Sequence, residues 1–380
     1  MRTQARIDLT AVRDNVAVLD RLAGSAGVMA VVKADGYGHG LVPTARAAVQ
    51  GGASWLGVAF LEEGLALRAA SVQSLAAVPI LAWLWAPGED LAAAVVARID
   101  LGVYGLAELA AVEAAARTAG TTARVHLKVD TGLSRGGAAM ADWPELCAAA
   151  AKVQAAGAIT VTGIWSHFAF ADGGPDHPTN NRQAAVFVEA LDVARRCGIE
   201  PEVRHLANSA ATLTAPATHF DLVRPGIAVY GLSPVPDVGG PEAFGLRPAM
   251  TLASHVALTK TVPAGSGVSY LHRYVTDRDT RLALVPMGYA DGVPRTATNL
   301  AQVQLAGRRR TIAGTVCMDQ FVLDVGDDDV SAGDEVLLFG PGDQGEPTAQ
   351  DWATSLGTIN YEIVTRVGAR VPRVYAGERP

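Results

Sequence analysis

Short apolar runs alternate with longer alanine-rich stretches from Val28 to about Tyr230. Runs of this length, bounded by glycine and polar residues, are typical of strands buried on both faces of a parallel sheet. The alanine-rich stretches between them are typical of helices. The expected strands are residues 28–32, 55–59, 79–83, 99–103, 125–129, 161–165, 203–206 and 222–223, and the expected helices include 61–70, 107–119, 138–156 and 181–197. Eight such units predict an α/β fold with an N-terminal (β/α)8 barrel.

The pattern changes after Pro234. Proline and glycine cluster through Pro248, and runs rich in valine, threonine and leucine then alternate with turns, with one helix expected at residues 348–356. This predicts a barrel domain at residues 1–234, whose segment up to Thr10 packs on the second domain, and a mostly-β domain at residues 235–380. Arg308, Arg309 and Arg310 are interpreted as a solvated hairpin turn.

The stretch from Val31 to Gly40 reads Val-Val-Lys-Ala-Asp-Gly-Tyr-Gly-His-Gly. It places Lys33 at the carboxyl end of a buried strand, where barrel enzymes keep their chemistry. A lysine held there in partly apolar surroundings can lose its proton and act as a nucleophile or base. A strand-end lysine with its ammonium in water is the commoner alternative on position alone.

Polar residues follow the later strands in the same way. Arg135 follows the fifth expected strand, His167 the sixth, Asn208 and Ser209 the seventh, and Arg224, Gly226 and Ile227 the eighth. Loops after the last two strands of a barrel commonly bind a phosphate through backbone N–H groups. A small residue at Gly226 and a hydroxyl at Ser209 suit that task, although Gly226 alone would also suit a turn.

Composition narrows the classes of function. The net charge is −7, and no dense basic run is present to bind nucleic acid. No apolar stretch is long enough to span a bilayer, and the amino terminus has no secretory signal, so a cytoplasmic protein is expected. The three cysteines, Cys147, Cys197 and Cys317, are far apart and lack metal-ligand spacing, so no metal site is expected.

The glycine-rich turn after Lys33 resembles the turn with which alanine racemases bind pyridoxal phosphate, and the match covers nearly the whole chain. The resemblance implies that Lys33 holds this cofactor as an internal aldimine and that Arg224 lies against the pyridine nitrogen. Further cofactor contacts are implied for Tyr37, His167, Asn208, Ser209, Gly226, Ile227 and Tyr361.

The resemblance extends to the second domain. Gly267-Val268-Ser269-Tyr270 resembles the segment whose tyrosine is the second catalytic base, reaching the cofactor of the partner subunit in a homodimer with shared active sites. Arg135 and Met318 are implied to bind the substrate, with Lys128, Cys317 and Asp319 in support. Asp172, Tyr289 and Arg295 are implied to line the access channel. In some members of the family the lysine at the position of Lys128 is carbamylated.

The implied activity is that of an isomerase interconverting L-alanine and D-alanine for cell-wall peptidoglycan. A single fixed base cannot serve both faces of the α-carbon, whereas Lys33 and Tyr270 can serve one face each. A tyrosine titrates near about 10 and needs a positive or donating environment to act as a base. The resemblance suggests that His167, hydrogen-bonded toward Arg224, provides it, and a buried core histidine is the alternative.

Three other functions remain open. A racemase of broader specificity, for example for serine, shares every feature above. A pyridoxal phosphate decarboxylase of the same fold usually has an acidic residue at the pyridine nitrogen, where this chain has Arg224. A non-enzymatic cofactor carrier of the barrel type would lack the second domain that contains Tyr270 and Met318.

Overall fold

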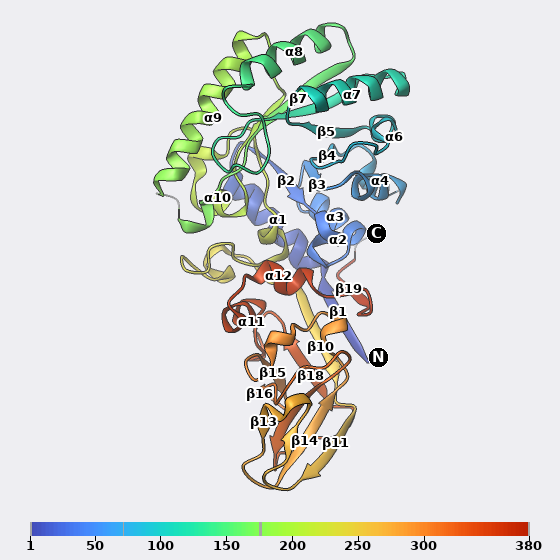
Figure 1. The fold of residues 1–380 in the computed structure, drawn as a ribbon, viewed down its shortest axis with the longest axis vertical. Helices are drawn as coiled ribbons and strands as arrows, with labels where there is room; N and C mark the ends of the chain where they lie inside the picture. The colour runs from blue at the N-terminus through green and yellow to red at the C-terminus, as the bar shows by residue number, and fades with distance from the viewer. Residues whose placement is uncertain (1, 71, 175–176, 379–380) are drawn as a thin grey trace. The chain divides into compact units, whose positions relative to one another are not determined.

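The computed structural model describes residues 2–70, 72–174 and 177–378. Two compact units divide the chain. The barrel unit comprises Val12–Gly36 and Leu41–Leu246, and the β unit comprises the described residues of Met1–Ala11, Tyr37–Gly40 and Arg247–Pro380. Figure 1 shows both units, coloured along the chain.

The barrel unit is built on eight parallel strands in the order β8-β7-β6-β5-β4-β3-β2-β9. Near-continuous burial explains why the strands β2, β3 and β4 are runs of apolar residues and not alternating ones. The strands are β2 (Gly27–Val31), β3 (Trp55–Val58), β4 (Ile80–Ala82), β5 (Ile99–Val103), β6 (Ala123–Lys128), β7 (Ile159–Trp165), β8 (Val203–His205) and β9 (Leu222–Val223). The expected α/β barrel with a mostly-β second part is therefore confirmed.

Two backbone hydrogen bonds and an ion pair bring the last strands together. The Asp221 N–H donates to the Arg204 carbonyl oxygen at 3.0 Å, and the Arg224 N–H donates to the Ala207 carbonyl oxygen at 2.9 Å. The Arg204 guanidinium contacts the Asp221 carboxylate at 2.6 Å. The loop after β8 and the loop after β9, which hold several candidate residues, are thereby fixed side by side.

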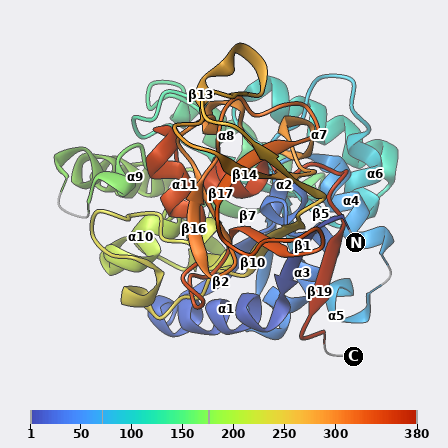
Figure 2. The ribbon, with the colours of Figure 1, turned by 90° about the horizontal axis from the view of Figure 1, so that it is seen from below.

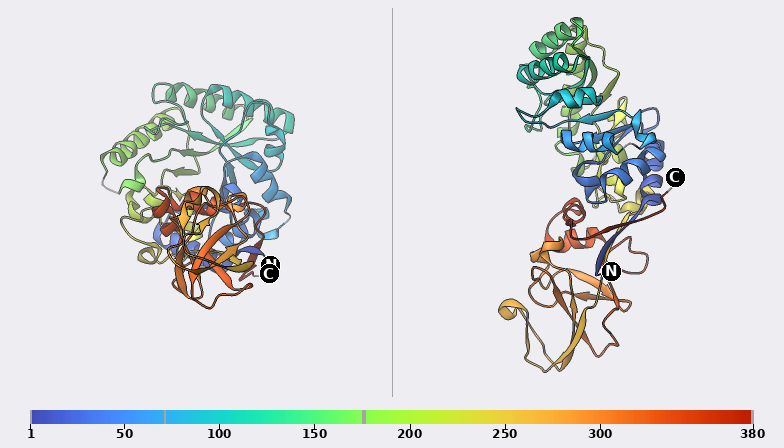
Figure 3. Two further views of the ribbon diagram at one scale, coloured as in Figure 1. Left: turned by 60° about the horizontal axis from the view of Figure 1, so that its bottom comes forward. Right: turned by 90° about the vertical axis from the view of Figure 1, so that its right-hand side faces the viewer.

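Helices surround the strands, as the left view of Figure 3 shows in blue to green. The helices from the first to the tenth are α1 (Leu9–Ala23), α2 (Lys33–Tyr37), α3 (Leu41–Gln50), α4 (Leu61–Ala69), α5 (Gln73–Ala76), α6 (Leu91–Val96), α7 (Leu106–Ala119), α8 (Trp143–Ala155), α9 (Pro178–Arg196) and α10 (Ser209–Thr214). Helix α8 begins five residues later than the expected 138. The reason is that Ala138 pairs with Val129 in an isolated β-bridge and is not free to join the helix.

The β unit contains three sheets. Its six-stranded sheet has the order β16-β15-β18-β10-β1-β19, its three-stranded sheet β11-β14-β17, and its two-stranded sheet β12-β13. Strand β1 (Thr3–Asp8) pairs antiparallel with β10 and parallel with β19, and Figure 2 shows β1 and β10 side by side. The remaining strands are β10 (Met250–His255), β11 (Leu258–Val262), β12 (Gly267–Val268), β13 (Tyr274–Val275), β14 (Thr280–Val285), β15 (Gln302–Leu305), β16 (Arg308–Thr311), β17 (Phe321–Gly326), β18 (Glu335–Phe339) and β19 (Arg373–Ala376).

The β unit also contains α11 (Ala349–Leu356) and α12 (Asn360–Thr365). The interpretation of Arg308–Arg310 as a turn is wrong, because these residues form strand β16 and the turn is at Ala306–Gly307, where both residues have positive φ. The guanidinium groups of Arg308 and Arg310 both contact Asp328. The Arg309 guanidinium contacts Asp351 at 3.1 Å, so each of the three consecutive arginines in the strand has a carboxylate partner.

Candidate active site

Lys33 directly follows the carboxyl end of β2, at the start of the turn α2. Ala34, Asp35 and Gly36 all have left-handed backbone angles, with φ between 53° and 60°. The Glu63 carboxylate accepts the Ala34 N–H at 2.6 Å and so holds the turn. Burial, followed by the positive charge of Arg135, lowers the pKa of Lys33, while Glu63 opposes the shift. A lowered pKa increases the fraction of free amine, the nucleophilic form.

The rings of two tryptophans inside the barrel lie close to the cations of the site. The ring centroids of Trp83 and Trp165 are 6.2 Å apart. The Lys33 Nζ lies 5.8 Å from the Trp83 ring centroid, the Lys128 Nζ 4.6 Å from that of Trp165, and the Arg224 guanidinium carbon 5.0 Å from that of Trp165. Indole faces attract cations electrostatically, so they offset part of the cost of burying three positive groups.

Lys128 is 7 % exposed. Burial, with the charges of Arg135 and Arg224, lowers its pKa to about 8. The Lys128 ammonium also lies 5.4 Å from the Tyr104 ring centroid. The side chain is therefore packed within the barrel interior beside the other cations and is not a surface lysine.

Arg224 is the most enclosed cation of the site, with 4 % of its surface exposed. Its Nη2 donates to the carbonyl oxygens of Ser166 and Leu206 at 2.7 and 3.1 Å, and its Nη1 donates to His205 Nδ1 at 3.0 Å. Burial lowers its pKa to about 9, which leaves the guanidinium charged at neutral pH. These bonds fix its orientation.

His167 also contacts Arg224, whose Nη2 lies 3.3 Å from His167 Nδ1. Burial and then the charges of Arg224 and Arg135 lower the pKa of His167 well below its ordinary value, so the ring is neutral. Because guanidinium nitrogens only donate, the hydrogen-bond geometry assigns the lone pair to Nδ1 and the proton to Nε2. His167 can therefore donate a hydrogen bond, but it does not supply a positive charge.

The loops after β8 and β9 meet at Ser209. Its hydroxyl oxygen accepts the N–H groups of Gly226 and Ala228 at 2.7 and 3.4 Å. Asn208 caps α10, with its side-chain oxygen accepting the Ala211 N–H at 3.0 Å. The structure thus brings Ser209 and Gly226 together, next to Ile227, whereas the side chain of Asn208 has a local role in helix capping.

Arg135 lies in the loop after β6. The Asp130 carboxylate shapes this loop by accepting the N–H groups of Gly132, Leu133 and Ser134 at 2.9 to 3.2 Å. The positive charge of Arg135 helps to lower the pKa values of Lys33, Lys128 and His167. Asp172 lies apart from these contacts, in a short helical turn at Ala171–Gly173.

In the β unit, Tyr270 begins a short helical turn that ends at His272 and is 70 % exposed. Hydrogen bonds tie its backbone to the segment containing Cys317. The Thr315 hydroxyl donates to the Tyr270 carbonyl oxygen at 2.7 Å, and the Ser269 hydroxyl donates to the Thr315 carbonyl oxygen at 2.6 Å. The Ser269 oxygen also lies 3.2 Å from the Cys317 sulfur. The backbone is held while the phenol remains accessible.

The segment of Met318 packs on the turn that contains Tyr289. The N–H groups of Tyr289 and Ala290 donate to the carbonyl oxygens of Cys317 and Met318 at 3.0 and 2.9 Å. This approach requires glycine at residue 288, because a Cβ there would come within 2.3 Å of the Cys317 carbonyl oxygen. The structure therefore brings the loops of Tyr270, Met318 and Tyr289 into one cluster within the β unit.

Asp319 and the channel candidates lie around this cluster. The Arg370 guanidinium contacts Asp319 at 2.8 Å and the fully buried Asp291 at 3.3 Å. Tyr289 and Arg295 line one cavity of about 350 Å³ together with Gly292, Val293, Pro294 and Arg366.

Tyr37 and Tyr361 form a pair in the β unit. Their ring centroids are 6.2 Å apart, and the rings are tilted by 47°. Tyr37 is 7 % exposed, and burial raises the pKa of its phenol, which keeps the hydroxyl protonated at neutral pH. Tyr361 lies in the first turn of α12.

Several residues of the barrel interior were not identified from the sequence, namely Trp83, Trp165, His126 and His205. A signal was present for His126, which stands between Val125 and Leu127 in strand β6. A polar residue inside a strand buried on both faces needs a partner. No pattern along the chain shows which partner it has.

Comparison with known proteins now decides the family. The family model for the alanine racemase N-terminal domain matches residues 7–234, and that for the alanine racemase C-terminal domain matches residues 249–375. The chain belongs to the alanine racemase family. The resemblance inferred from the motifs is thereby confirmed.

Relatives and solved structures of the family match over the full length. An alanine racemase from Frankia casuarinae is 66 % identical over 375 residues, covering 99 % of this chain and 96 % of the relative. The alanine racemase structure from D-cycloserine-producing Streptomyces lavendulae is 55 % identical with a TM-score of 0.97, covering 100 % of this chain and 98 % of the other. The alanine racemase structure from Clostridium difficile is 33 % identical with a TM-score of 0.90, covering 99 % of this chain and 96 % of the other.

Two further classes of feature are absent from the part of the chain that the structure describes. Across residues 2–70, 72–174 and 177–378, no helix is both long and apolar enough to cross a membrane. Over the same residues, histidine, cysteine and acidic side chains nowhere gather in a group of three that could hold a metal ion.

Proposed function

We propose that this chain interconverts L-alanine and D-alanine with pyridoxal phosphate, using Lys33 and Tyr270 as two bases. The observation that carries the proposal is the pairing, inside one barrel, of a strand-end lysine whose pKa is lowered with a buried arginine held in one orientation. Membership in the alanine racemase family supports the choice of reaction.

The residues of the barrel unit fit a phosphorylated pyridine. Lys33 offers an amine, Arg224 a guanidinium that can donate to a ring nitrogen, and the Ser209 and Gly226 loops a hydroxyl and backbone N–H groups for an anion. Ile227 begins the short helical turn that follows Gly226, and His167 and Asn208 would flank the site. Tyr37 and Tyr361 would add hydroxyl groups to the phosphate site. When bound, pyridoxal phosphate delocalises the negative charge left at the substrate α-carbon.

The two bases would act on opposite faces of that carbon. The Lys33 amine takes or returns the proton on the face of D-alanine, and the Tyr270 phenol does so on the face of L-alanine. A phenol titrates near about 10, so Tyr270 needs a donor to stabilise its phenolate form. The Nε2–H of neutral His167 is that donor in our proposal, and Arg224 fixes its direction.

Arg224 has a second consequence for the reaction. Its guanidinium keeps its own proton at neutral pH and can only donate. Arg224 would therefore hold the pyridine nitrogen of the cofactor by a hydrogen bond without giving it a proton, and the bound cofactor would withdraw electrons less strongly. An arginine at this place distinguishes the site from that of a decarboxylase with an acidic residue there.

The remaining residues would bind and admit the substrate. Arg135 and the backbone of Met318 would hold the alanine carboxylate, with Lys128, Cys317 and Asp319 in support. Asp172, Tyr289 and Arg295 would line the access channel. The high exposure of Tyr270 supports a homodimer in which this phenol completes the site of the partner subunit.

We further propose the domain boundary at 234 and 235, cytoplasmic location, and supply of D-alanine for peptidoglycan as the biological role. A racemase of broader specificity is the second candidate, because the same bases would serve L-serine. The tyrosines proposed at the entrance, Tyr270, Tyr289 and Tyr361, favour a small side chain.

A racemisation assay tests the proposal. The purified protein with pyridoxal phosphate is given L-alanine, L-serine or a long-chain L-amino acid, and the D-enantiomer is measured by chiral chromatography. We expect rapid formation of D-alanine and much slower formation of the others. No conversion of alanine would refute the function, and comparable turnover of the long side chain would refute the substrate preference.

A further inference from the structure

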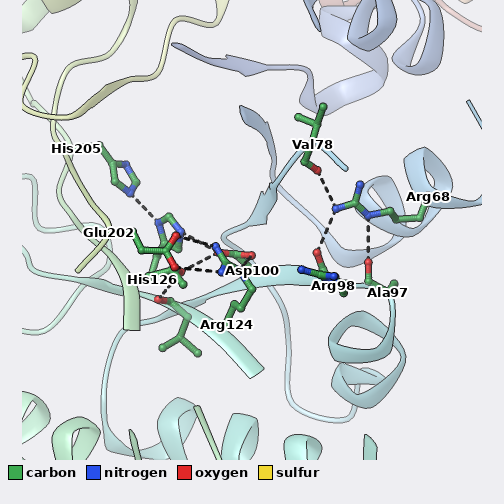
Figure 4. Close-up of polar contacts among 11 residues, drawn as sticks. Arg68, Val78, Ala97, Arg98, Asp100, Arg124, His126, Glu202 and His205 are labelled. Carbon is green, nitrogen blue, oxygen red and sulfur yellow. Dashed lines mark hydrogen bonds and ion pairs between the residues drawn. The ribbon is translucent and has the colours of Figure 1, made fainter. Parts of the chain in front are cut away.

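Three buried side chains form a row that continues inward from Arg224. His205 Nδ1 lies 3.0 Å from Arg224 Nη1, and His205 Nε2 lies 2.8 Å from His126 Nδ1. His126 Nε2 lies 3.2 Å from Asp100 Oδ2. Figure 4 shows His205, His126 and Asp100 together with Arg124 and Glu202. We call Asp100, His126 and His205 the inner row.

The inner row is enclosed by the barrel. Both histidines are 0 % exposed, and Asp100 is 1 % exposed. The His205 ring stacks on Trp165 with centroids 5.7 Å apart and planes inclined by 7°. Gly163 makes room for His126, because a Cβ at residue 163 would lie 2.2 Å from His126 Nδ1. The rings are therefore held by packing, and bulk water is excluded from them.

The hydrogen bonds of the inner row can run in only one direction. Arg224 only donates, so His205 Nδ1 must hold a lone pair. Burial, followed by the positive charge of Arg224, lowers the pKa of His205 well below its ordinary value, so the neutral ring has its proton on Nε2. That proton is donated to His126 Nδ1, which leaves the His126 Nε2–H to donate to Asp100.

Asp100 is the acceptor at the end of this sequence. Burial alone would raise its pKa, but hydrogen bonds from His126 and Arg124 and the positive charge of Arg124 lower it, so the group is a carboxylate. Its oxygens also accept from the Thr162 hydroxyl at 2.8 Å and from Arg124 Nε at 2.9 Å. A carboxylate with no proton to give determines the tautomers of both histidines.

We propose that Asp100 and His126 are positioning residues, which keep a lone pair of His205 facing Arg224. The negative charge of the Asp100 carboxylate polarises the His126 and His205 rings and so acts on Arg224 through them. The site has an excess of positive charge that such a carboxylate would offset. The charged groups that act on His167 are all cations, namely Arg224, Arg135, Lys128 and Lys33. The Asp100 carboxylate, at the far end of the inner row, offsets part of this positive charge. The expected effect of the inner row on catalysis rests on the proposed function, whereas the expected tautomers of His126 and His205 do not.

Asp100→Asn gives a sharp test because Arg124 can only donate. The amide oxygen of Asn must face Arg124, so its N–H2 group must face His126. His126 and His205 then both have to move their protons from Nε2 to Nδ1, and His205 presents an N–H to the N–H of Arg224. Glu202→Gln is the matched control, since it removes a carboxylate that contacts Arg124 at 3.2 Å but not the inner row.

Two measurements are made on the full chain loaded with pyridoxal phosphate. Nitrogen NMR of protein labelled with ¹⁵N-histidine reports which ring nitrogen has the proton, with His126→Gln and His205→Gln spectra for assignment. We expect Nε2–H for both histidines in the wild type and in Glu202→Gln, and Nδ1–H for both in Asp100→Asn. We also expect kcat to fall about 10- to 100-fold in Asp100→Asn, as is typical when the outer partner of an orienting histidine is lost, and to stay unchanged in Glu202→Gln.

A proton on Nδ1 of wild-type His205 would overturn the proposal. So would moved protons with an unchanged kcat, which would make the inner row purely structural. A wild type that does not racemise alanine would refute the proposed function instead, and its tautomers would still decide the direction of the row.

If Asp100→Asn does not fold, two substitutions of His126 test the same proposal. In His126→Gln the side chain can still accept from His205 and donate to Asp100, whereas His126→Leu can do neither at similar size. We expect His126→Gln to keep the Nε2–H tautomer of His205 and most of the turnover, and His126→Leu to lose both. Equal turnover in the two variants would contradict a positioning role.

Discussion

Arg224 and Lys128 of the barrel unit differ sharply in exposure from Tyr270 and Met318 of the β unit. In the barrel unit, Arg224 and Lys128 are 4 % and 7 % exposed and contact tryptophan faces and hydrogen-bond acceptors. In the β unit, Tyr270 and Met318 are 70 % and 53 % exposed, although their backbones are fixed by hydrogen bonds.

The difference shows that the barrel unit orients its own chemical groups, while the β unit presents side chains that need a surface to act on. Buried cations must be paired and oriented within the unit that encloses them, because desolvated charge without partners is costly. An exposed phenol on a fixed backbone has no such requirement. A homodimer with shared sites would give Tyr270 a partner of that kind, and the predictions below test this division of roles.

Lys33→Ala should have the largest effect, because Lys33 is the only proposed base in the barrel unit. We expect racemisation to fall on the order of a thousandfold or more, as for loss of a catalytic nucleophile, together with loss of the visible absorbance of lysine-bound cofactor. Chiral chromatography and absorbance spectroscopy measure the two. Normal turnover with cofactor bound to another lysine would refute the assignment.

Tyr270→Phe should affect one face of the substrate only. We expect racemisation to fall about 10²- to 10⁴-fold, the usual contribution of a general base, while Lys33 still exchanges the α-proton of D-alanine with solvent. Proton NMR in deuterated water follows the exchange. Tyr274→Phe is the control, since that phenol bonds Asp324 at 2.8 Å within a separate strand of the β unit. Equal loss of exchange for both enantiomers would show that Tyr270 serves more than its own face.

Mixed dimers test whether the exposed phenol completes the partner subunit's site. Inactive Lys33→Ala and Tyr270→Ala proteins are unfolded together and reassembled at random. Half of the dimers should then be mixed, each with one intact site, so activity should recover to roughly a quarter of wild type under two-fold symmetry. No recovery, with mixed dimers shown by mass spectrometry, would place both residues of a site in one chain.

Lys128→Met should have the smallest effect, and it concerns stability. The pKa of Lys128 is about 8 in the folded protein, below the value of about 10.4 expected when unfolded. Between these two pH values the unfolded state therefore binds more protons than the folded state. The contribution of Lys128 makes the free energy of unfolding of the wild type rise with pH across this window, and this contribution is least favourable below pH 8.

We expect the variant to be more stable than wild type by about 1–3 kcal/mol at pH 7 and the difference to shrink from pH 8 to pH 10. Urea unfolding in carbon-dioxide-free buffer measures it. A difference that does not change with pH would show that the Lys128 ammonium is fully compensated in the folded state.

The fold could be predicted from the sequence because parallel strands buried on both faces favour continuous apolar runs, and the alanine-rich stretches between them favour helices. The strand at 99–103 agrees with β5 at both ends, and the strand-end location of Lys33 followed from the run before it. Helix α8 and strand β16 differed from expectation because a bridge at Ala138 and the ion pairs of Arg308 and Arg310 with Asp328 depend on residues distant in the chain.

The sequence by itself therefore determined which residues stand at strand ends, since strand period and turn chemistry are local properties. Only the tertiary structure decided the states of these groups. The pKa of Lys33 depends on burial and Arg135, the lone pair of His167 on Arg224, and the direction of the inner row on Asp100. Desolvation and hydrogen bonding act through space, and the pairing of β5 with β6, β6 with β7 and β7 with β8 brings Asp100, His126 and His205 into one line.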